Sequence, residues 1–308
     1  MTVRVGWRIP QFPADESKGE EFVSQIVRSL EEAQGAFDSA WMEDHMVPGA
    51  AWAKADGVAL EGWTTVTYLM GVFKRLSFGH IVLCNSYRNP ALLAKMGATL
   101  ACLAPARFIL GLGAGWKENE YKSYGYKFPS AADRIESLGE AIQIIRKMWT
   151  EETTNFKGKY YEIIDAYCNP KPNPIPPIMV GGAGAKLLRL VATRADWWNM
   201  LGTPDEYEHR LNILRTHCRD IGRELTSIKK TWLGNISISE SHEEAALITD
   251  RSPFPAGETT ITGNPVDVAR ELRKYADLGV EYFILRFLDF PDTKGAKLFA
   301  EKVAPQLR

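Results

Sequence analysis

Short apolar runs alternate with longer segments in which apolar residues recur every three or four positions. The short runs predict buried strands, and the longer segments predict amphipathic helices. The predicted strands cover residues 3–9, 39–42, 77–84, 108–113, 178–181, 196–200, 229–237 and 282–287. The predicted helices cover residues 20–34, 60–73, 90–103, 131–149, 185–194, 204–221, 265–278 and 293–303. This alternation predicts an α/β fold, a TIM (β/α)8 barrel formed as one domain by residues 1–308. A doubly wound sheet is the alternative, because short apolar runs are easily miscounted.

Two segments interrupt the alternation. Residues 117–130 form a connection that is long for this kind of fold. Residues 153–177 contain two strand-like pieces around Lys157-Gly158-Lys159, followed by a proline-rich stretch. We expect this second segment to be an inserted hairpin and loop that covers part of the rim at the carboxyl ends of the strands.

Composition narrows the classes of partner. Apolar residues make up 45% of the chain and charged residues 24%, so a large core is available. Lys and Arg (37) nearly balance Asp and Glu (38), and neither a nucleic acid nor an anionic membrane is therefore expected as the main partner. The first residues do not have the charged start and apolar core of a signal peptide, and no uninterrupted apolar run is long enough to span a bilayer.

The cysteines and histidines show no metal-binding pattern. Cys84, Cys102, Cys168 and Cys218 are scattered without C-x-x-C spacing, and the five histidines show no ligand spacing. We therefore expect no disulfide bond and no metal site. Unpaired cysteines also favour the cytoplasm as the compartment.

In a barrel, functional residues lie at the carboxyl ends of the strands. The polar run Glu43-Asp44-His45 falls at such an end, and an imidazole can donate or accept a proton near neutral pH. Glycine-rich runs at residues 111–115 and 181–184 fall at two others, where bare backbone lets a ligand approach. The second run precedes a predicted helix, whose unpaired N–H groups can bind a phosphate. The alternatives are a histidine that only satisfies a loop and glycines that only form tight turns.

Two arginines also fall at strand ends. Arg88, after the third strand, could neutralise a bound anion, although a solvated loop arginine fits the sequence equally well. Arg286 lies at the end of the eighth strand. The spacing G-x-G-x-G at residues 111–115 differs from the G-x-G-x-x-G of dinucleotide-binding folds, and G-x-S-x-G is absent. These patterns argue against a Rossmann dehydrogenase and a serine hydrolase.

Motifs distributed along the chain indicate a known family. They are FDSAWMEDH (37–45), EGWTT (61–65), YRNPALLAK (87–95), RFILGLGAG (107–115), FKGKYY (156–161), NPKP (169–172), VGG (180–182) and GNP (263–265). Together they resemble the bacterial luciferase-like family over roughly residues 3–290, and more narrowly its branch that uses the deazaflavin coenzyme F420. The resemblance implies a TIM barrel that carries a flavin or deazaflavin in a cavity at the strand ends, usually as a homodimer.

The resemblance also assigns residues to the site. It places His45 beside the coenzyme ring as the catalytic residue, and it places an unusual bulge or cis peptide that supports the ring at Asn85-Ser86. The expected coenzyme-binding residues are Asp44, Asn85, Ser86, Arg88, Gly113, Ala114, Gly115, Asn119, Gly181, Gly182, Ala183 and Gly184. Within this set, the loop from Gly181 to Gly184 is expected to hold the coenzyme phosphate. Arg88 and Lys95 are candidates for contacts with the anionic tail of F420.

One position departs from the family pattern. Members that oxidise sugar phosphates or alcohols place a glutamate directly after the glycine loop, where this chain has Trp116. That substrate class is therefore not carried over. We expect Trp116 to form an apolar wall for a less polar substrate, with Arg286 as a second residue of the substrate pocket.

These features predict an oxidoreductase that transfers a hydride between F420 and a small organic substrate. The first alternative is a two-component monooxygenase that uses FMN and O2. A separate coenzyme-reducing enzyme would supply its reduced FMN. A flavin-binding protein without catalytic activity is the second.

Overall fold

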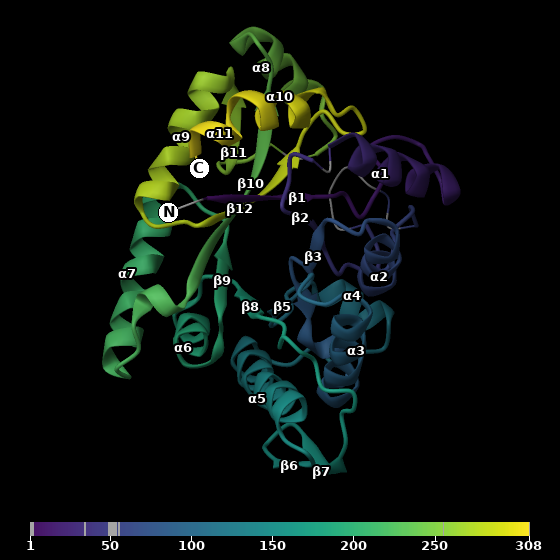
Figure 1. Cartoon of the computed structure of the whole chain (residues 1–308), viewed down its shortest axis with the longest axis vertical. Coiled ribbons are helices and arrows are strands. Elements are labelled where there is room, and N and C mark those ends of the chain that lie inside the picture. Colours follow the sequence, from purple (N-terminus) through teal and green to yellow (C-terminus); the bar gives the residue numbers. More distant parts are fainter. Residues whose placement is uncertain (1–2, 34, 49–53, 55, 255, 308) are drawn as a thin grey trace.

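The computed structural model describes residues 3–33, 35–48, 54, 56–254 and 256–307 (Figure 1). Its principal strands form a ring in which each strand pairs with its neighbours in parallel, and β10 closes the ring by pairing with both β9 and β12. The ring contains β1 (Arg4–Arg8), β2 (Ser39–Met42), β3 (Ser77–His80), β5 (Phe108–Gly113), β8 (Ile178–Gly181), β9 (Trp197–Met200), β10 (Lys229–Ile238) and β12 (Tyr282–Phe287). The predicted TIM barrel is confirmed, because a doubly wound sheet would stay open at two edges.

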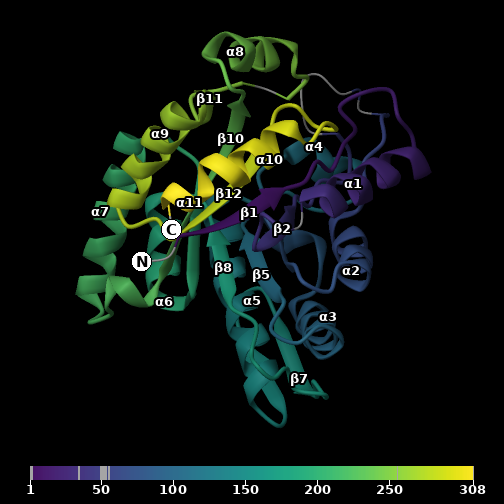
Figure 2. The same cartoon turned by 45° about the horizontal axis from the view of Figure 1, so that its top comes forward.

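Helices surround the barrel (Figures 1 and 2). They are α1 (Glu20–Ala33), α2 (Gly62–Val72), α3 (Pro90–Leu103), α5 (Ala131–Thr150), α6 (Ala185–Arg194), α7 (Pro204–Asp220), α9 (Pro265–Asp277), α10 (Lys294–Lys302) and the short α11 (Ala304–Leu307). Several begin at strong local signals. The Thr203 side chain and Glu206 form a capping box at α7, and Asn89 caps α3 with Pro90 in its first turn. Such signals explain why most predicted bounds lie within two residues of the observed ones.

Several short elements, including α11, were not predicted. Helix α4 (Glu118–Ser123) lies inside the segment expected to be a loop at residues 117–130. Helix α8 (His242–Arg251) and strand β11 (Thr260–Gly263) lie between β10 and α9, and β11 extends the sheet from the end of β10. Ser241 caps α8 by accepting a hydrogen bond from the Glu244 N–H, so the S-x-x-E signal was present in the sequence. The 3₁₀ turn η2 (Leu225–Ser227) precedes β10.

The third strand is divided. β3 ends at His80, and β4 (Leu83–Cys84) continues the strand by pairing with β5. The peptide bond between Ile81 and Val82 is cis. The predicted bulge or cis peptide therefore exists, but it lies between β3 and β4 and not at Asn85-Ser86. Those two residues belong to the 3₁₀ turn η1 (Asn85–Tyr87).

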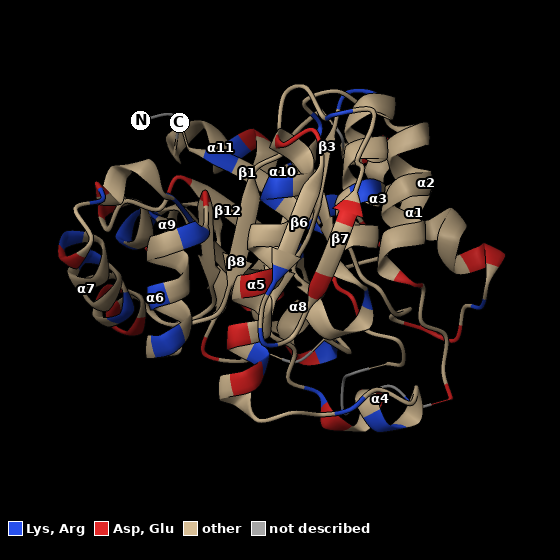
Figure 3. Ribbon diagram, turned by 90° about the horizontal axis from the view of Figure 1, so that it is seen from below, with Lys and Arg blue, Asp and Glu red and all other residues tan. Residues whose placement is uncertain are grey.

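The inserted segment forms the predicted hairpin, and only its turn reaches the predicted rim. The Tyr160 hydroxyl donates to Asp133 in the first turn of α5, and the Tyr161 hydroxyl accepts from Asn85, which follows β4. Strands β6 (Thr154–Lys157) and β7 (Glu162–Ala166) pair antiparallel and lie on the outside of the barrel beside α5 (Figures 1 and 3). The Glu140 carboxylate on α5 accepts hydrogen bonds from the N–H groups of Lys159 and Tyr160. The proline-rich stretch returns to the opposite end of the barrel, where Lys171 bonds to the last turn of α5. No residue of 153–177 lines the main cavity.

The barrel interior is filled by side chains. Trp41, Ile81, Ile109, Met179, Leu233, Tyr282 and Ile284 form one buried cluster inside the ring. A larger apolar cluster packs between the strands and the surrounding helices. The interior cluster confines open space to one end of the barrel, as in other TIM barrels.

Charge is mixed on some outer helices and of one sign on others. Figure 3 shows basic and acidic segments interspersed on α7, whereas α6 carries only basic residues, Lys186, Arg189 and Arg194. In the part of the chain that the structure describes, no helix is long and apolar enough to cross a membrane.

Candidate functional site

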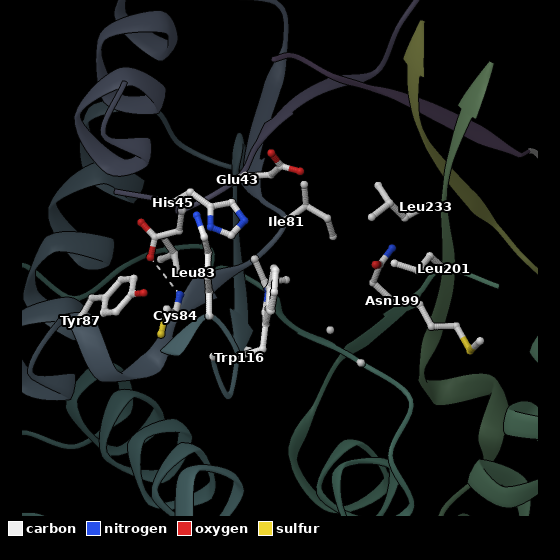
Figure 4. Close-up of a pocket in the computed structure, with 18 of the residues that line it drawn as sticks. Glu43, His45, Ile81, Leu83, Cys84, Tyr87, Trp116, Asn199, Leu201 and Leu233 are labelled. Carbon is white, nitrogen blue, oxygen red and sulfur yellow. Dashed lines mark hydrogen bonds between the residues drawn. The ribbon is translucent and has the colours of Figure 1, made fainter. Parts of the chain in front are cut away.

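A cavity of about 570 Å³ opens at the carboxyl ends of the strands. It is lined by Arg8, Glu43, Asp44, His45, Ile81, Val82, Leu83, Cys84, Tyr87, Gly113, Gly115, Trp116, Lys117, Glu120, Gly181, Gly182, Ala183, Asn199, Met200, Leu201 and Leu233. Figure 4 shows His45 and Trp116 on one side of the cavity and Asn199, Leu201 and Leu233 on the other. The lining is largely apolar with a few convergent polar groups, which is typical of a site for an organic ligand.

His45 is held at its backbone by Gln11, a fully buried side chain. The Gln11 carbonyl oxygen accepts from the His45 N–H at 3.0 Å, and its amide group donates to the carbonyls of His45 and Leu60, both at 2.7 Å. These bonds fix the chain where β2 leads into the cavity. The His45 ring packs edge to face against Trp116, with ring centres 5.8 Å apart.

The ring of His45 is oriented by Glu120. Its Nδ1 lies 3.1 Å and 3.2 Å from the two carboxylate oxygens. The other ring nitrogen, Nε2, has no hydrogen-bond partner among the described residues, while His45 lines the cavity. A carboxylate that holds one imidazole nitrogen leaves the other available for proton transfer.

Glu120 is buried in a network of donors. The Lys117 ammonium lies 2.9 Å from its carboxylate, and the Tyr87 hydroxyl donates to it at 3.0 Å. Burial alone would raise the pKa of Glu120, but the hydrogen bonds from His45 and Lys117 outweigh it and lower the pKa to about 2. Burial raises the pKa of Tyr87, which stays a phenol that donates. Glu120 is therefore an ionised group beside His45 at neutral pH.

The turn after β8 leads to the first turn of α6. Gly182 has φ +132°, a conformation that other residues rarely adopt. Gly184 occupies the N-cap position of α6, and no side chain caps the helix there. A Cβ at Gly184 would meet no atom within 4 Å. The first N–H groups of α6 can therefore donate hydrogen bonds to an anion beside the cavity.

The protein family of the chain follows from a match to a family model. The model for luciferase-like monooxygenases matches residues 3–254. The chain belongs to the luciferase-like monooxygenase family. This result confirms the family resemblance seen in the sequence motifs.

Proteins similar to this chain are named for different coenzymes. The F420-dependent glucose-6-phosphate dehydrogenase of Kineococcus radiotolerans is 28% identical over 309 residues, which cover 90% of this chain and 90% of that protein. Among solved structures, an F420-dependent secondary alcohol dehydrogenase in complex with an F420-acetone adduct has a TM-score of 0.83 at 20% identity and covers both chains fully. Riboflavin lyase with modified FMN and riboflavin has a TM-score of 0.84 at 15% identity, over 100% of this chain and 92% of that one. The two solved structures show the shared fold.

The structure of this luciferase-like protein brings many of the predicted site residues together. Those that line the cavity are Asp44, His45, Gly113, Gly115, Trp116, Gly181, Gly182 and Ala183. Ala114 and Gly184 are adjacent in sequence to lining residues but do not line the cavity themselves. Trp116 is 68% exposed at the cavity mouth, so its face is available to a ligand.

Gly113 and Gly181 leave room for a neighbouring side chain of the protein as well as for a ligand. A Cβ on Gly113 would lie 2.5 Å from Val82 Cγ2, and one on Gly181 would lie 2.9 Å from Val82 Cγ1. Both glycines therefore make room for the Val82 side chain beside the division between β3 and β4. Part of the glycine pattern that indicated a ligand is explained by this internal contact.

Arg88 pairs with carboxylates of the protein itself. Its guanidinium forms two hydrogen bonds with the Asp44 carboxylate, at 2.7 Å and 2.8 Å, and also pairs with Glu61. Burial alone would lower the pKa of Arg88, but the Asp44 carboxylate raises it above its ordinary value. Lys95 donates to the Asn169 carbonyl and is not part of the cavity lining. Neither residue lines the cavity, and their contacts with an anionic tail stay a prediction.

Three other predicted coenzyme contacts lie outside the cavity lining. The Asn85 amide donates to the Tyr161 hydroxyl at 3.1 Å, and Ser86 accepts from Tyr121 at 3.0 Å. Asn119 is exposed, and its side chain accepts from the N–H of Glu120. The α4 helix, absent from the prediction, turns Glu120 inward in place of Asn119.

Arg286 is buried behind the lining and pairs with Glu43, which also pairs with Arg8. Arg8 and Glu43 do line the cavity, whereas the predicted pocket residue Arg286 does not. Burial lowers the pKa of Arg286 to about 10. Among the described residues, no group of three His, Cys, Asp or Glu side chains is placed to hold a metal ion.

Proposed function

We propose that this protein is an oxidoreductase that transfers a hydride between bound coenzyme F420 and a small organic substrate. The observation that carries the proposal is the His45–Glu120 pair, which points one imidazole nitrogen into an organic-ligand cavity. The 28% identical relative is named an F420-dependent dehydrogenase, which supports this coenzyme.

The cavity residues fit a deazaflavin. The cavity offers an apolar space for a ring system, and the first turn of α6 offers unpaired N–H groups for its phosphate. When bound, F420 takes up or gives a hydride at its ring and barely activates oxygen. Gly181, Gly182 and Ala183 lie where the cavity meets α6, so they can approach the phosphate side of the coenzyme.

His45 moves the proton that accompanies the hydride. Its Nε2 donates a proton to the substrate heteroatom during reduction and removes it during oxidation. The ionised Glu120 holds Nδ1 and stabilises the imidazolium, while Lys117 and Tyr87 hold Glu120 in place. Glu120 therefore acts as a positioning residue.

The substrate is less polar than a sugar phosphate. Trp116, Ile81, Leu201 and Leu233 contribute apolar surface to the cavity. Trp116 stands beside His45, so it would pack against the part of the substrate next to the reacting atom.

An FMN-dependent monooxygenase is the second candidate, favoured by the family description and by the fold shared with riboflavin lyase. It would need a separate reductase and O2. A flavin-binding protein without turnover is the third candidate. Both alternatives use the same cavity. The monooxygenase would bind FMN there, and the binding protein would catalyse no reaction.

The test is titration of the purified chain with F420 and with FMN, followed by single-turnover hydride transfer to candidate acceptors. Native mass spectrometry of the purified protein first identifies any small molecule that stays bound. We expect F420 to bind more tightly and to exchange hydride. Tight FMN binding with oxygen consumption, and no response to F420, would favour the monooxygenase. Binding of F420 without any turnover would favour the binding protein without catalytic activity.

We also propose a cytoplasmic homodimer. The free thiols of Cys84, Cys168 and Cys218 are buried, which suits a reducing compartment. If reduction is the physiological direction, a separate enzyme supplies the reduced coenzyme.

A further inference from the structure

Two guanidinium groups share one carboxylate at the cavity. Arg8 ends β1, Glu43 follows β2, and Arg286 lies on β12, so three adjacent strands bring them together. The Arg286 Nη2 lies 3.2 Å from Glu43 Oε1, and Arg8 pairs with the same oxygen. The side chains of Arg8, Glu43 and Arg286 are 17%, 11% and 8% exposed.

The cluster carries one uncompensated positive charge. Within ion-pair distance, neither guanidinium meets a second carboxylate among the described residues. The Nε atoms of Arg8 and Arg286 are buried and have no hydrogen-bond partner in this part of the structure. Burial and the charge of Arg286 lower the pKa of Arg8 well below its ordinary value. A buried, incompletely paired charge is costly unless a ligand balances it.

The cluster also meets the cavity that contains His45. Arg8 and Glu43 both line it, together with the apolar side chains Ile81 and Leu233. We propose that Arg8, held by Glu43 and with the charge of Arg286 behind it, anchors a carboxylate group of the substrate, whose remaining body is apolar. This inference rests on the proposed function and names the substrate class for the same cavity.

The charge count favours a carboxylate over a phosphate monoester. One surplus positive charge is balanced by one negative charge, whereas a phosphate dianion would leave a buried negative charge. Guanidinium groups also match the two oxygens of a carboxylate geometrically. The anchor would fix one end of the substrate while His45 reaches another part of it.

The experiment is calorimetric titration of the full chain with hexanoate and with hexanamide, which has the same length but no charge. Each titration is done with the free protein and with the protein saturated with F420. We expect hexanoate to bind about tenfold more tightly than hexanamide in both states. In Arg8→Gln, which leaves a neutral Arg286–Glu43 pair, the two probes should bind equally.

The control is Arg146→Gln, because Arg146 pairs with Asp196 away from the cavity and is not among its lining residues. It should keep the full preference for hexanoate.

Equal binding or no binding of the two probes by the wild-type protein overturns the anchor, and this holds even if Arg8→Gln does not fold. A preference that survives in folded Arg8→Gln also overturns it. Loss of hexanoate binding on saturation with F420 would assign the cluster to the coenzyme. Failure of F420 to bind counts against the proposed function, while the probe comparison in free protein still tests the anchor.

Discussion

Gln11 holds the backbone of His45, and Glu120 holds its ring. The ring can therefore be removed without removing the contact that fixes the backbone. Its side chain makes no hydrogen bond to the described part of the fold other than those to Glu120. Truncation of the ring therefore removes the proton-transfer group and leaves the hydrogen bonds between Gln11 and the His45 backbone in place.

We expect His45→Ala to lower kcat about a hundredfold, within the usual range for one positioned acid–base group. Thermal unfolding should show a folded protein with F420 affinity close to wild type. A fully active variant, or one that unfolds, would support a structural role for His45.

Glu120→Gln tests the positioning of His45. It removes the charge beside Nδ1, and we expect a decrease in kcat that is smaller than for His45→Ala. The matched control is Glu118→Gln on the same helix, where Glu118 is exposed and, among the described residues, forms an ion pair only with Lys122. Equal activity of the two variants would show that the Glu120 carboxylate does not support catalysis.

His80 gives a prediction about stability and pH. Burial lowers its pKa from 6.5 to about 3, and its ring stacks on Trp63 with ring centres 5.4 Å apart. Below the unfolded pKa of about 6.5, the unfolded chain takes up a proton that the folded protein excludes, so stability falls as pH falls toward 3. We expect wild type to lose about 1 kcal/mol more than His80→Phe between pH 6 and pH 5, in denaturant titrations. Parallel pH profiles for the two proteins would contradict the assignment to His80.

At the scale of elements, the turn between β8 and α6 presents the helix end to the cavity. Gly182 is a poor probe of this turn, because its φ is +132° and a Cβ would lie 2.3 Å from Leu187 Cδ2. A substitution there would combine strain with a lost ligand contact. Gly184 has an ordinary φ of −66° and open space at its Cβ position.

We therefore expect Gly184→Val to fold normally and to weaken F420 binding about tenfold, since a branched side chain would shield the N–H groups that donate to the phosphate. The control is Gly71→Val in α2, where a Cβ also meets no atom within 4 Å. Fluorescence titration of both variants gives the affinities. Unchanged F420 affinity in folded Gly184→Val would show that the coenzyme phosphate does not bind at this turn.

For the whole molecule, the cavity lies at one end of the barrel, and exposed apolar side chains lie on helices outside it. Tyr68 and Val72 on α2 are 53% and 41% exposed, and Leu92 and Leu103 on α3 are 56% and 73% exposed. Figures 1 and 2 show these two helices side by side. Each pair lies on one helix face by its spacing, and exposed apolar surface of this kind often marks a protein interface.

We expect the chain to sediment as a dimer and Leu103→Glu to shift it toward the monomer, because a buried unpaired carboxylate is costly at an interface. Leu247→Glu is the control, since Leu247 is 49% exposed on α8. A monomeric wild-type protein would contradict the homodimer, and a Leu103→Glu dimer would contradict this surface.

The sequence determined the order of elements, the barrel, the family and the end of the barrel that carries the site. These features depend on local periodicity, capping residues and short motifs, all of which are visible along the chain. The position of His45 followed from the same information, because it ends the short polar run that follows a strand of clear apolar character.

Only the tertiary structure decided which polar groups meet. Glu120, and not Asn119, faces the cavity because α4 sets the direction of each side chain. Arg88 pairs with Asp44, 44 residues away, and Glu43 joins Arg8 to Arg286 across separations of 35 and 243 residues. A charged residue in a sequence indicates only that a partner is needed. Which partner it finds depends on how the closed barrel brings distant strand ends together.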